Sequence, residues 1–170
     1  MAHVCVIARG TRWHDNCTVI GMSTIPAQPT EAGQAARARI VVADDDLDTR
    51  ELVSDFLREE GYDVQEVANG SELLVRVEDS FVGGPGATPV SLFITDIHMP
   101  GYMGTEVVEG LRQAGLKTPV IVMTALGVEQ ARRHTESLDA AFLCKPFNRE
   151  QLLTLVRAAL LEAPPPGTER

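Results

Sequence analysis

Short apolar runs alternate with amphipathic stretches from residue 40 to residue 162. Four of the runs are almost wholly apolar, and they cover residues 40–43, 91–95, 119–123 and 140–144. A fifth run, residues 62–67, roughly alternates apolar with polar positions, which is typical of a half-buried strand. Runs of this length, each followed by a helical spacing, favour short strands over buried helices. The pattern therefore predicts a strand followed by a helix, five times in succession.

Apolar residues fall on one helical face in four of the five stretches that follow the runs. They are Leu52, Val53, Phe56 and Leu57; Leu73, Leu74 and Val77 within residues 71–79; Val107, Val108 and Leu111; and Leu152, Leu153, Val156 and Leu160. The remaining stretch, residues 127–138, is polar and predicts an exposed helix. Gly61 and Gly115 are typical helix stops. Asn148, with Gln151 three residues later, indicates a capping box at the start of the last helix.

The repeated alternation predicts an α/β fold, with a five-stranded parallel sheet, helices on both of its faces and right-handed crossovers. We expect one domain over residues 39–162. Residues 1–38 show no sustained period and contain Pro26 and Pro29, so we expect a disordered extension there. Residues 163–170 include three consecutive prolines and are expected to form a tail.

The net charge of −9 argues against non-specific binding to nucleic acid. The first 39 residues carry four Arg against Asp15 and Glu31, so the acidity lies in the rest of the chain. The three cysteines, Cys5, Cys17 and Cys144, form no C-x-x-C pair, and their odd number argues against a disulfide framework. We therefore expect a reducing, cytoplasmic location. No apolar stretch has the length of a membrane span, so membrane insertion is not expected.

Polar residues stand at the ends of four of the predicted strands. Asp44 and Asp45 follow the first strand, whereas the third strand is expected to end at Asp96, the fourth near Thr124 and the fifth at Lys145. The carboxyl ends of the strands form the binding crevice of an open α/β sheet. Three carboxylates, a hydroxyl and an ammonium at that edge would make a site for a divalent cation and a phosphoryl group.

Magnesium prefers an octahedron of oxygen ligands and keeps several waters. Asp45 and Asp96 are candidates for direct carboxylate ligands, Asp44 for the partner of a coordinated water, and the main-chain carbonyl of His98 for a further ligand. Asp46 and Asp48 are better explained as acids at a helix start.

An EF-hand is a competing interpretation of the same acids, because Asp44, Asp46 and Asp48 stand at alternate positions. That calcium loop requires Gly at its sixth position and Glu at its twelfth. Counted from Asp44, these positions are Thr49 and Asp55, so we reject the EF-hand.

Asp96 is the candidate nucleophile, since a carboxylate can attack phosphorus and form an aspartyl phosphate. Phosphoryl transfer requires positioning and neutralisation of charge on the equatorial oxygens. A magnesium ion would neutralise one side, and Lys145 with the Thr124 hydroxyl would neutralise the other.

The segments 39–46, 92–101, 122–125 and 145–147 resemble the motifs of the receiver domain of two-component response regulators, in order and at similar spacing. The resemblance covers residues 40–162. It implies a flavodoxin-like strand order of 2-1-3-4-5, and magnesium bound directly by Asp45 and Asp96 with Asp44 nearby. It also implies that Asp96 accepts phosphate from a histidine kinase or a histidine phosphotransfer protein.

The resemblance further implies a switch in which the Thr124 hydroxyl moves toward the phosphoryl group and the Phe142 ring turns inward. The surface of the fourth helix, fifth strand and fifth helix is then altered, and a downstream protein partner would respond to it. A cis bond between Lys145 and Pro146 is implied as well. Met103 departs from the family, which often has Asp at that position.

Only eight residues follow Glu162, so we expect a stand-alone receiver that either signals through protein contacts or passes phosphate onward to a histidine phosphotransfer partner. It is expected to accept phosphate rather than to turn over a substrate, with slow self-dephosphorylation. A magnesium-dependent phosphatase is one rival, but such enzymes usually have a second acid where this chain has His98. A receiver-like module that is never phosphorylated is the other, and it would be expected to lack an acid or the lysine.

Overall fold

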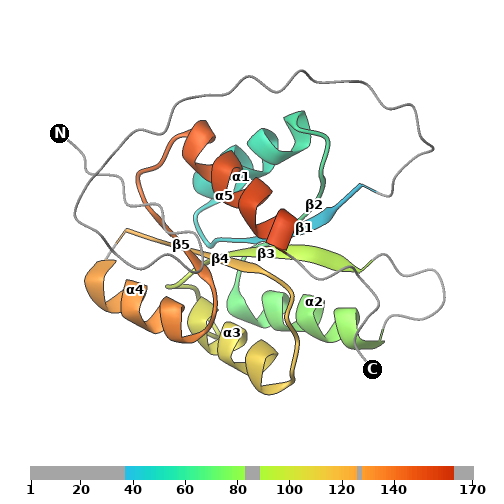
Figure 1. The fold of residues 1–170 in the computed structure, drawn as a ribbon, viewed down its shortest axis with the longest axis vertical. Helices are drawn as coiled ribbons and strands as arrows, with labels where there is room; N and C mark the ends of the chain where they lie inside the picture. The colour runs from blue at the N-terminus through green and yellow to red at the C-terminus, as the bar shows by residue number, and fades with distance from the viewer. Residues whose placement is uncertain (1–36, 83–88, 126–127, 163–170) are drawn as a thin grey trace.

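The computed structural model describes residues 37–82, 89–125 and 128–162. Strands and helices alternate through these residues (Figure 1). In chain order they are β1 (Arg39–Ala43), α1 (Leu47–Glu59), β2 (Asp63–Val67), α2 (Gly70–Val82), β3 (Val90–Asp96), α3 (Gly104–Gln113), β4 (Val120–Thr124), α4 (Val128–Ser137), β5 (Ala141–Cys144) and α5 (Arg149–Glu162). Apart from residues 37 and 38, the predicted extension lies outside the described residues, as does the predicted tail.

The strands form one parallel sheet in the order β2-β1-β3-β4-β5. Helices α1 and α5 cover one face of the sheet, and α2, α3 and α4 cover the other (Figure 1). This confirms the α/β fold predicted from the pattern and the strand order implied by the resemblance. None of the helices in the described part of the chain combines the length and apolar character that a membrane crossing requires.

Strands β1, β3 and β4 are mostly apolar because both faces of the sheet are covered, whereas the edge strand β2 contains alternating polar residues. Alternate residues enter different clusters: Ile40 and Val42 of β1 pack on the side of α1 and α5, whereas Val41 and Ala43 pack on the side of α2 and α3. The polar ends of the strands are therefore held on a framework that is apolar on both sides.

Most of the predicted strand ends at the functional residues agree with the structure. Asp96 and Thr124 are the last residues of β3 and β4, as predicted, whereas β5 ends at Cys144, one residue before the predicted end at Lys145. Both side chains therefore take the alternating orientation of a strand rather than that of a loop. Helix α2 is longer at both ends than the predicted residues 71–79. Its earlier start is explained by Asn69, which accepts a hydrogen bond from the Glu72 main-chain N–H at 2.9 Å and caps the helix.

The capping box predicted for α5 is confirmed. The main-chain N–H of Gln151 donates to Asn148 Oδ1 at 2.9 Å, and the main-chain N–H of Asn148 donates to Gln151 Oε1 at 2.8 Å. Asp46 likewise begins α1 by accepting from the Thr49 main-chain N–H at 2.8 Å. These caps fix where the helices start relative to the strand ends.

Candidate functional site

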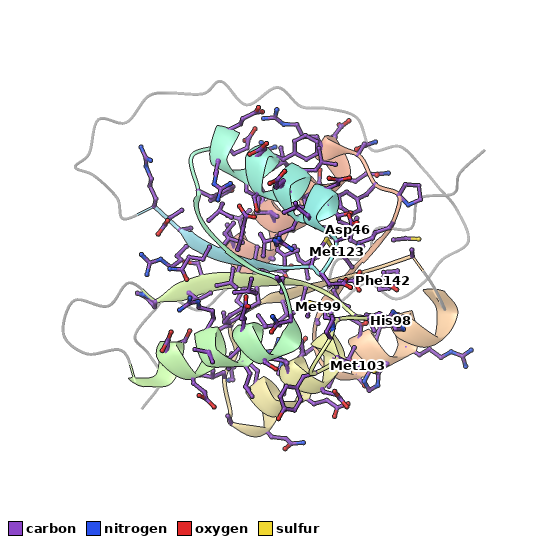
Figure 2. The ribbon with its side chains drawn as sticks, turned by 180° about the vertical axis from the view of Figure 1, so that it is seen from behind. Asp46, His98, Met99, Met103, Met123 and Phe142 are labelled. Atoms are coloured by element: carbon purple, nitrogen blue, oxygen red, sulfur yellow. The ribbon has the colours of Figure 1, made fainter. Side chains whose placement is uncertain are left out.

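Asp44, Asp96, Thr124 and Lys145 reach the same edge of the sheet because the strands are parallel and in register. Asp96 pairs with Met123 of β4, one residue before Thr124. Thr124 in turn pairs with Cys144, one residue before Lys145. In Figure 2 the labelled residues Asp46, His98, Met123 and Phe142 lie at this end of the molecule.

The Lys145 ammonium joins two carboxylates. Its Nζ lies 2.7 Å from Asp44 Oδ2 and 2.6 Å from Asp96 Oδ1. Asp44 is fully buried and Asp96 is 7% exposed, so both acids are largely removed from water. The main-chain N–H of Lys145 donates to the Thr124 carbonyl at 2.8 Å, which holds the start of the lysine against the end of β4. The Lys145–Pro146 bond that follows is cis, as the resemblance implied.

The second oxygen of each carboxylate accepts from the main chain. The N–H of His98 donates to Asp96 Oδ2 at 2.6 Å, and the N–H of Asp46 donates to Asp44 Oδ1 at 3.1 Å. Each acid is therefore oriented by two donors from different parts of the chain. One is always Lys145, and the other lies two residues beyond the acid itself.

Burial and pairing act against each other on the charges of this cluster. Burial raises the pKa of Asp44 above its usual range, and the hydrogen bond and charge of Lys145 offset this only in part. Burial alone would lower the pKa of Lys145, but the hydrogen bonds and charges of Asp44 and Asp96 outweigh it and raise the pKa. The lysine is thus held as a cation, whereas burial disfavours the charged form of Asp44.

Gly104, the first residue of α3, packs directly on the main chain of Asp96. A Cβ atom at this position would lie 2.0 Å from the Asp96 carbonyl oxygen and 2.6 Å from Thr95 Oγ1. The Thr95 hydroxyl donates to that same carbonyl oxygen at 2.9 Å. Sequence reasoning did not assign this role to Gly104, although a glycine that opens a helix directly after a turn is a signal of close backbone approach.

Arg50 of α1 also contacts the site, and the sequence did not single it out. Its Nη1 donates to the main-chain oxygen of Asp44 at 2.6 Å. An arginine on a predicted helix face is usually solvated, and a contact to a main-chain carbonyl leaves no pattern in the sequence. The contact of Arg50 with Asp44 is therefore evident only from the structure.

The remaining predicted residues differ in their exposure. Asp45 is exposed, and so is the residue His98. Thr124 and Phe142 are buried, the latter on β5 opposite Val122. Among residues 37–82, 89–125 and 128–162, no three His, Cys, Asp or Glu side chains are gathered as a ready metal site. The roles predicted for these four residues stay predictions.

The donor set nevertheless fits magnesium. Two carboxylates converge on a single point of positive charge at Lys145. Asp45 is the next residue after Asp44, and the His98 carbonyl is close in sequence to Asp96. Carboxylate and carbonyl oxygens are the ligands that this cation takes in proteins.

Comparison with known proteins agrees with this geometry. A match to the family described as the response regulator receiver domain spans residues 40–157. The transcriptional regulatory protein CpxR of Escherichia coli K12 is 33% identical over 72% of this chain and 49% of its own length. The CpxR homolog of Haemophilus influenzae is 31% identical over 76% of this chain and 53% of its own length. The chain thus spans about half the length of the curated relatives it matches.

Among solved structures, the chemotaxis protein CheY4 of Vibrio cholerae superposes with a TM-score of 0.63. It is 28% identical, and the alignment covers 74% of this chain and all of CheY4. The strand order, the acidic cluster with its lysine and the family match over most of the described residues agree with one another. The chain belongs to the response regulator receiver domain family of two-component signalling.

Proposed function

We propose that Asp96 accepts a phosphoryl group from a phosphohistidine, carried by a sensor histidine kinase or a histidine phosphotransfer protein. The observation that carries the proposal is the Lys145 ammonium, which lies 2.6 Å from Asp96 Oδ1 and 2.7 Å from Asp44 Oδ2. A cation in that position would neutralise charge on the incoming phosphoryl oxygens without moving far.

In the transfer, a carboxylate oxygen of Asp96 attacks phosphorus and forms an O–P bond. The N–P bond of the phosphohistidine breaks, and its electron pair stays on the imidazole nitrogen. The His98 N–H holds the other Asp96 oxygen at 2.6 Å and so keeps the carboxylate oriented during the attack. The product replaces a singly charged carboxylate with a more highly charged phosphoryl group.

Asp45, Asp96 and the His98 carbonyl would hold a magnesium ion, with Asp44 beside it. When bound, the ion would supply charge neutralisation at the phosphoryl oxygens and relieve the repulsion between the acids. The residues of this chain provide the orientation, because Asp44 and Asp96 are each fixed by two hydrogen bonds.

Thr124 and Phe142 are the proposed switch residues. The main-chain bond from Lys145 to Thr124 joins the ends of β4 and β5, so a lysine that follows the phosphoryl group would act on both strands. The Thr124 hydroxyl would then move toward the phosphoryl group. The surface of α4, β5 and α5 would change for a downstream protein partner.

The proposal describes a phosphoacceptor rather than an enzyme that turns over a substrate, apart from slow self-dephosphorylation. A cytoplasmic location and the lack of direct nucleic-acid binding remain predictions from the sequence. A transcriptional output, which the names of the CpxR relatives carry, is not part of the proposal.

Incubation with phosphoramidate and Mg²⁺, followed by intact-protein mass spectrometry, tests the proposal. We expect a gain of one phosphoryl group in the native chain and none in Asp96→Asn. Asp48→Asn, which removes an exposed acid from the first turn of α1, is the matched control and should be phosphorylated normally. No gain in the native chain would favour the module that is never phosphorylated, and steady turnover of phosphate esters would favour the phosphatase.

A further inference from the structure

Arg50 holds the peptide unit that joins Asp44 to Asp45. Its Nη1 donates to the Asp44 main-chain oxygen at 2.6 Å, a short distance that is typical of a charge-assisted hydrogen bond. The main-chain N–H of Asp44 bonds on its other side to the Val67 carbonyl, at 3.3 Å. The turn between β1 and α1 is therefore anchored both to β2 and to the arginine.

The guanidinium of Arg50 is itself anchored. Its Nε lies 3.5 Å from Glu66 Oε2 on β2, and its side chain is only 12% exposed. Glu66 also bonds through Oε1 to Arg58 Nη2 at 2.7 Å. Two arginines of α1 thus share one acid, but the bond to the Asp44 carbonyl belongs to Arg50.

We propose that Arg50 is a positioning residue for the metal-binding acids, an inference that rests on the proposed function. A peptide unit is planar, so fixing the Asp44 oxygen also fixes the Asp45 nitrogen and the direction of its Cα. The Asp44 carboxylate has two hydrogen-bond partners of its own, whereas Asp45 is exposed. Arg50 therefore fixes the main-chain position from which the Asp45 side chain extends.

Magnesium makes this positioning important, since it demands a nearly ideal octahedron. Groups that orient metal ligands commonly change affinity by about 10- to 100-fold when they are removed. Arg50 orients the main chain of a ligand rather than its side chain, which places the expected effect at the lower end, about tenfold.

The sign of the effect separates positioning from simple electrostatics. An arginine near a cation site repels the cation, so a role as a mere charge predicts tighter magnesium binding when it is removed. A positioning role predicts weaker binding. Arg58 offers the matched control, because it sits on the same helix and bonds to the same Glu66.

The experiment measures the Mg²⁺ dissociation constant of the full chain by isothermal titration calorimetry, in native protein, Arg50→Met and Arg58→Met. We expect about tenfold weaker binding in Arg50→Met and unchanged or slightly tighter binding in Arg58→Met. Arg50→Lys, which keeps one donor for the carbonyl, should recover part of the loss. In metal-free protein, the amide resonance of Asp45 should shift in Arg50→Met and stay in place in Arg58→Met.

Thermal unfolding of each variant confirms that the titrations are made on folded protein. Should Arg50→Met not fold, Glu66→Gln removes the second anchor of Arg50 and should weaken magnesium binding to a smaller extent. Equal or tighter binding in the Arg50 variants, relative to Arg58→Met, would overturn the inference. An absence of magnesium binding in the native chain would instead count against the metal part of the proposed function.

Discussion

Two cationic side chains lie at opposite ends of the parallel strands, at the carboxyl and the amino edge of the sheet. They bond to different kinds of oxygen. At the carboxyl edge, Lys145 joins the carboxylates of Asp44 and Asp96. At the amino edge, where β4 and β5 begin, Arg112 of α3 bonds to main-chain carbonyls. The two clusters have similar distances but different chemistry.

Arg112 has four carbonyl partners in the two loops that precede these strands. Its Nε donates to Leu138 at 2.8 Å, its Nη1 to Leu116 at 2.8 Å and Thr118 at 3.0 Å, and its Nη2 to Asp139 at 3.1 Å. A carbonyl oxygen is neutral and needs a donor in every state of the protein. A carboxylate changes its charge when it is protonated, metallated or phosphorylated. The amino edge is therefore fixed, whereas the carboxyl edge can exchange its partners.

Helix α3 connects the two edges. Substitutions of its glycines Gly104 and Gly110 give the largest expected contrast in the free energy of unfolding. Gly104→Ala places a Cβ 2.0 Å from the Asp96 carbonyl oxygen and should lower the free energy of unfolding by roughly 3 kcal/mol or more. Gly110→Ala meets no atom within 4 Å and should raise it by about 1 kcal/mol, because alanine favours the helix. Urea denaturation measures both, and equal effects would show that Gly104 is not in close contact with Asp96.

Arg112→Met tests the fixed edge. Loss of four charge-assisted hydrogen bonds should lower the free energy of unfolding by about 3 kcal/mol, since water can replace only some of the donors. Added Mg²⁺ should not restore the loss, because the carbonyls lie at the far edge from the proposed metal site. Arg76→Met is the control, since Arg76 forms one exposed ion pair, with Asp79, and should change stability by less than about 1 kcal/mol. Recovery of the free energy of unfolding on addition of Mg²⁺ would contradict the distinction between a fixed amino edge and an exchangeable carboxyl edge.

Lys145→Met tests the exchangeable edge. It leaves two buried carboxylates without their cation and should cost about 2 kcal/mol at neutral pH, less than for a fully buried pair because the lysine is partly solvated. Burial raises the pKa of Asp44 above 3.8, and Lys145 lowers it in part, so Asp44 should have a higher pKa in the variant than in the native protein. As the pH falls, the folded variant therefore binds a proton at Asp44 first. The difference in the free energy of unfolding between variant and native protein should be largest at neutral pH and shrink as the pH falls toward 4.

Urea denaturation of both proteins across this pH range measures the difference in their free energies of unfolding. Effects of pH on groups that the two proteins share cancel in this difference. Mg²⁺ at neutral pH should also reduce this difference, because the ion would replace the positive charge of the lost Lys145 ammonium. A difference that is constant with pH and insensitive to Mg²⁺ would make Lys145 a structural cation like Arg112.

The smallest expected effect is at Met103, which precedes α3 at the carboxyl edge. Glu106 accepts from the Met103 N–H at 2.8 Å, but methionine offers no oxygen to the first N–H groups of the helix. Met103→Asn should therefore stabilise the protein by about 1 kcal/mol relative to Met103→Ala, measured as a rise in Tm. Equal Tm values for the two variants would show that a side-chain cap does not stabilise the start of α3.

The same comparison explains what the sequence could predict. The strands, and the edge that gathers Asp44, Asp96 and Lys145, follow from apolar runs and the direction of parallel strands. Side-chain pairs with a fixed spacing, such as Asn148 and Gln151, were equally readable. The spacing alone did not indicate that the Lys145 ammonium would bond to both acids at once.

Arg50 and Arg112 could not be predicted because their partners are carbonyl oxygens, which every residue carries. The close contact of Gly104 could not be predicted either, since it depends on where α3 packs. The predicted start of α2 is one residue late because Asn69 was not recognised as a cap. In each case the missing information was tertiary rather than local.

Lys145 comes 101 residues after Asp44 and 49 after Asp96. A nascent chain that has emerged from the ribosome only as far as β4 already contains both acids, but not their cation. Lys145 can pair with Asp44 and Asp96 only once the fifth strand docks on the fourth. Any translation product that stops before that strand would carry Asp96, the proposed phosphoacceptor, without the lysine that pairs with it.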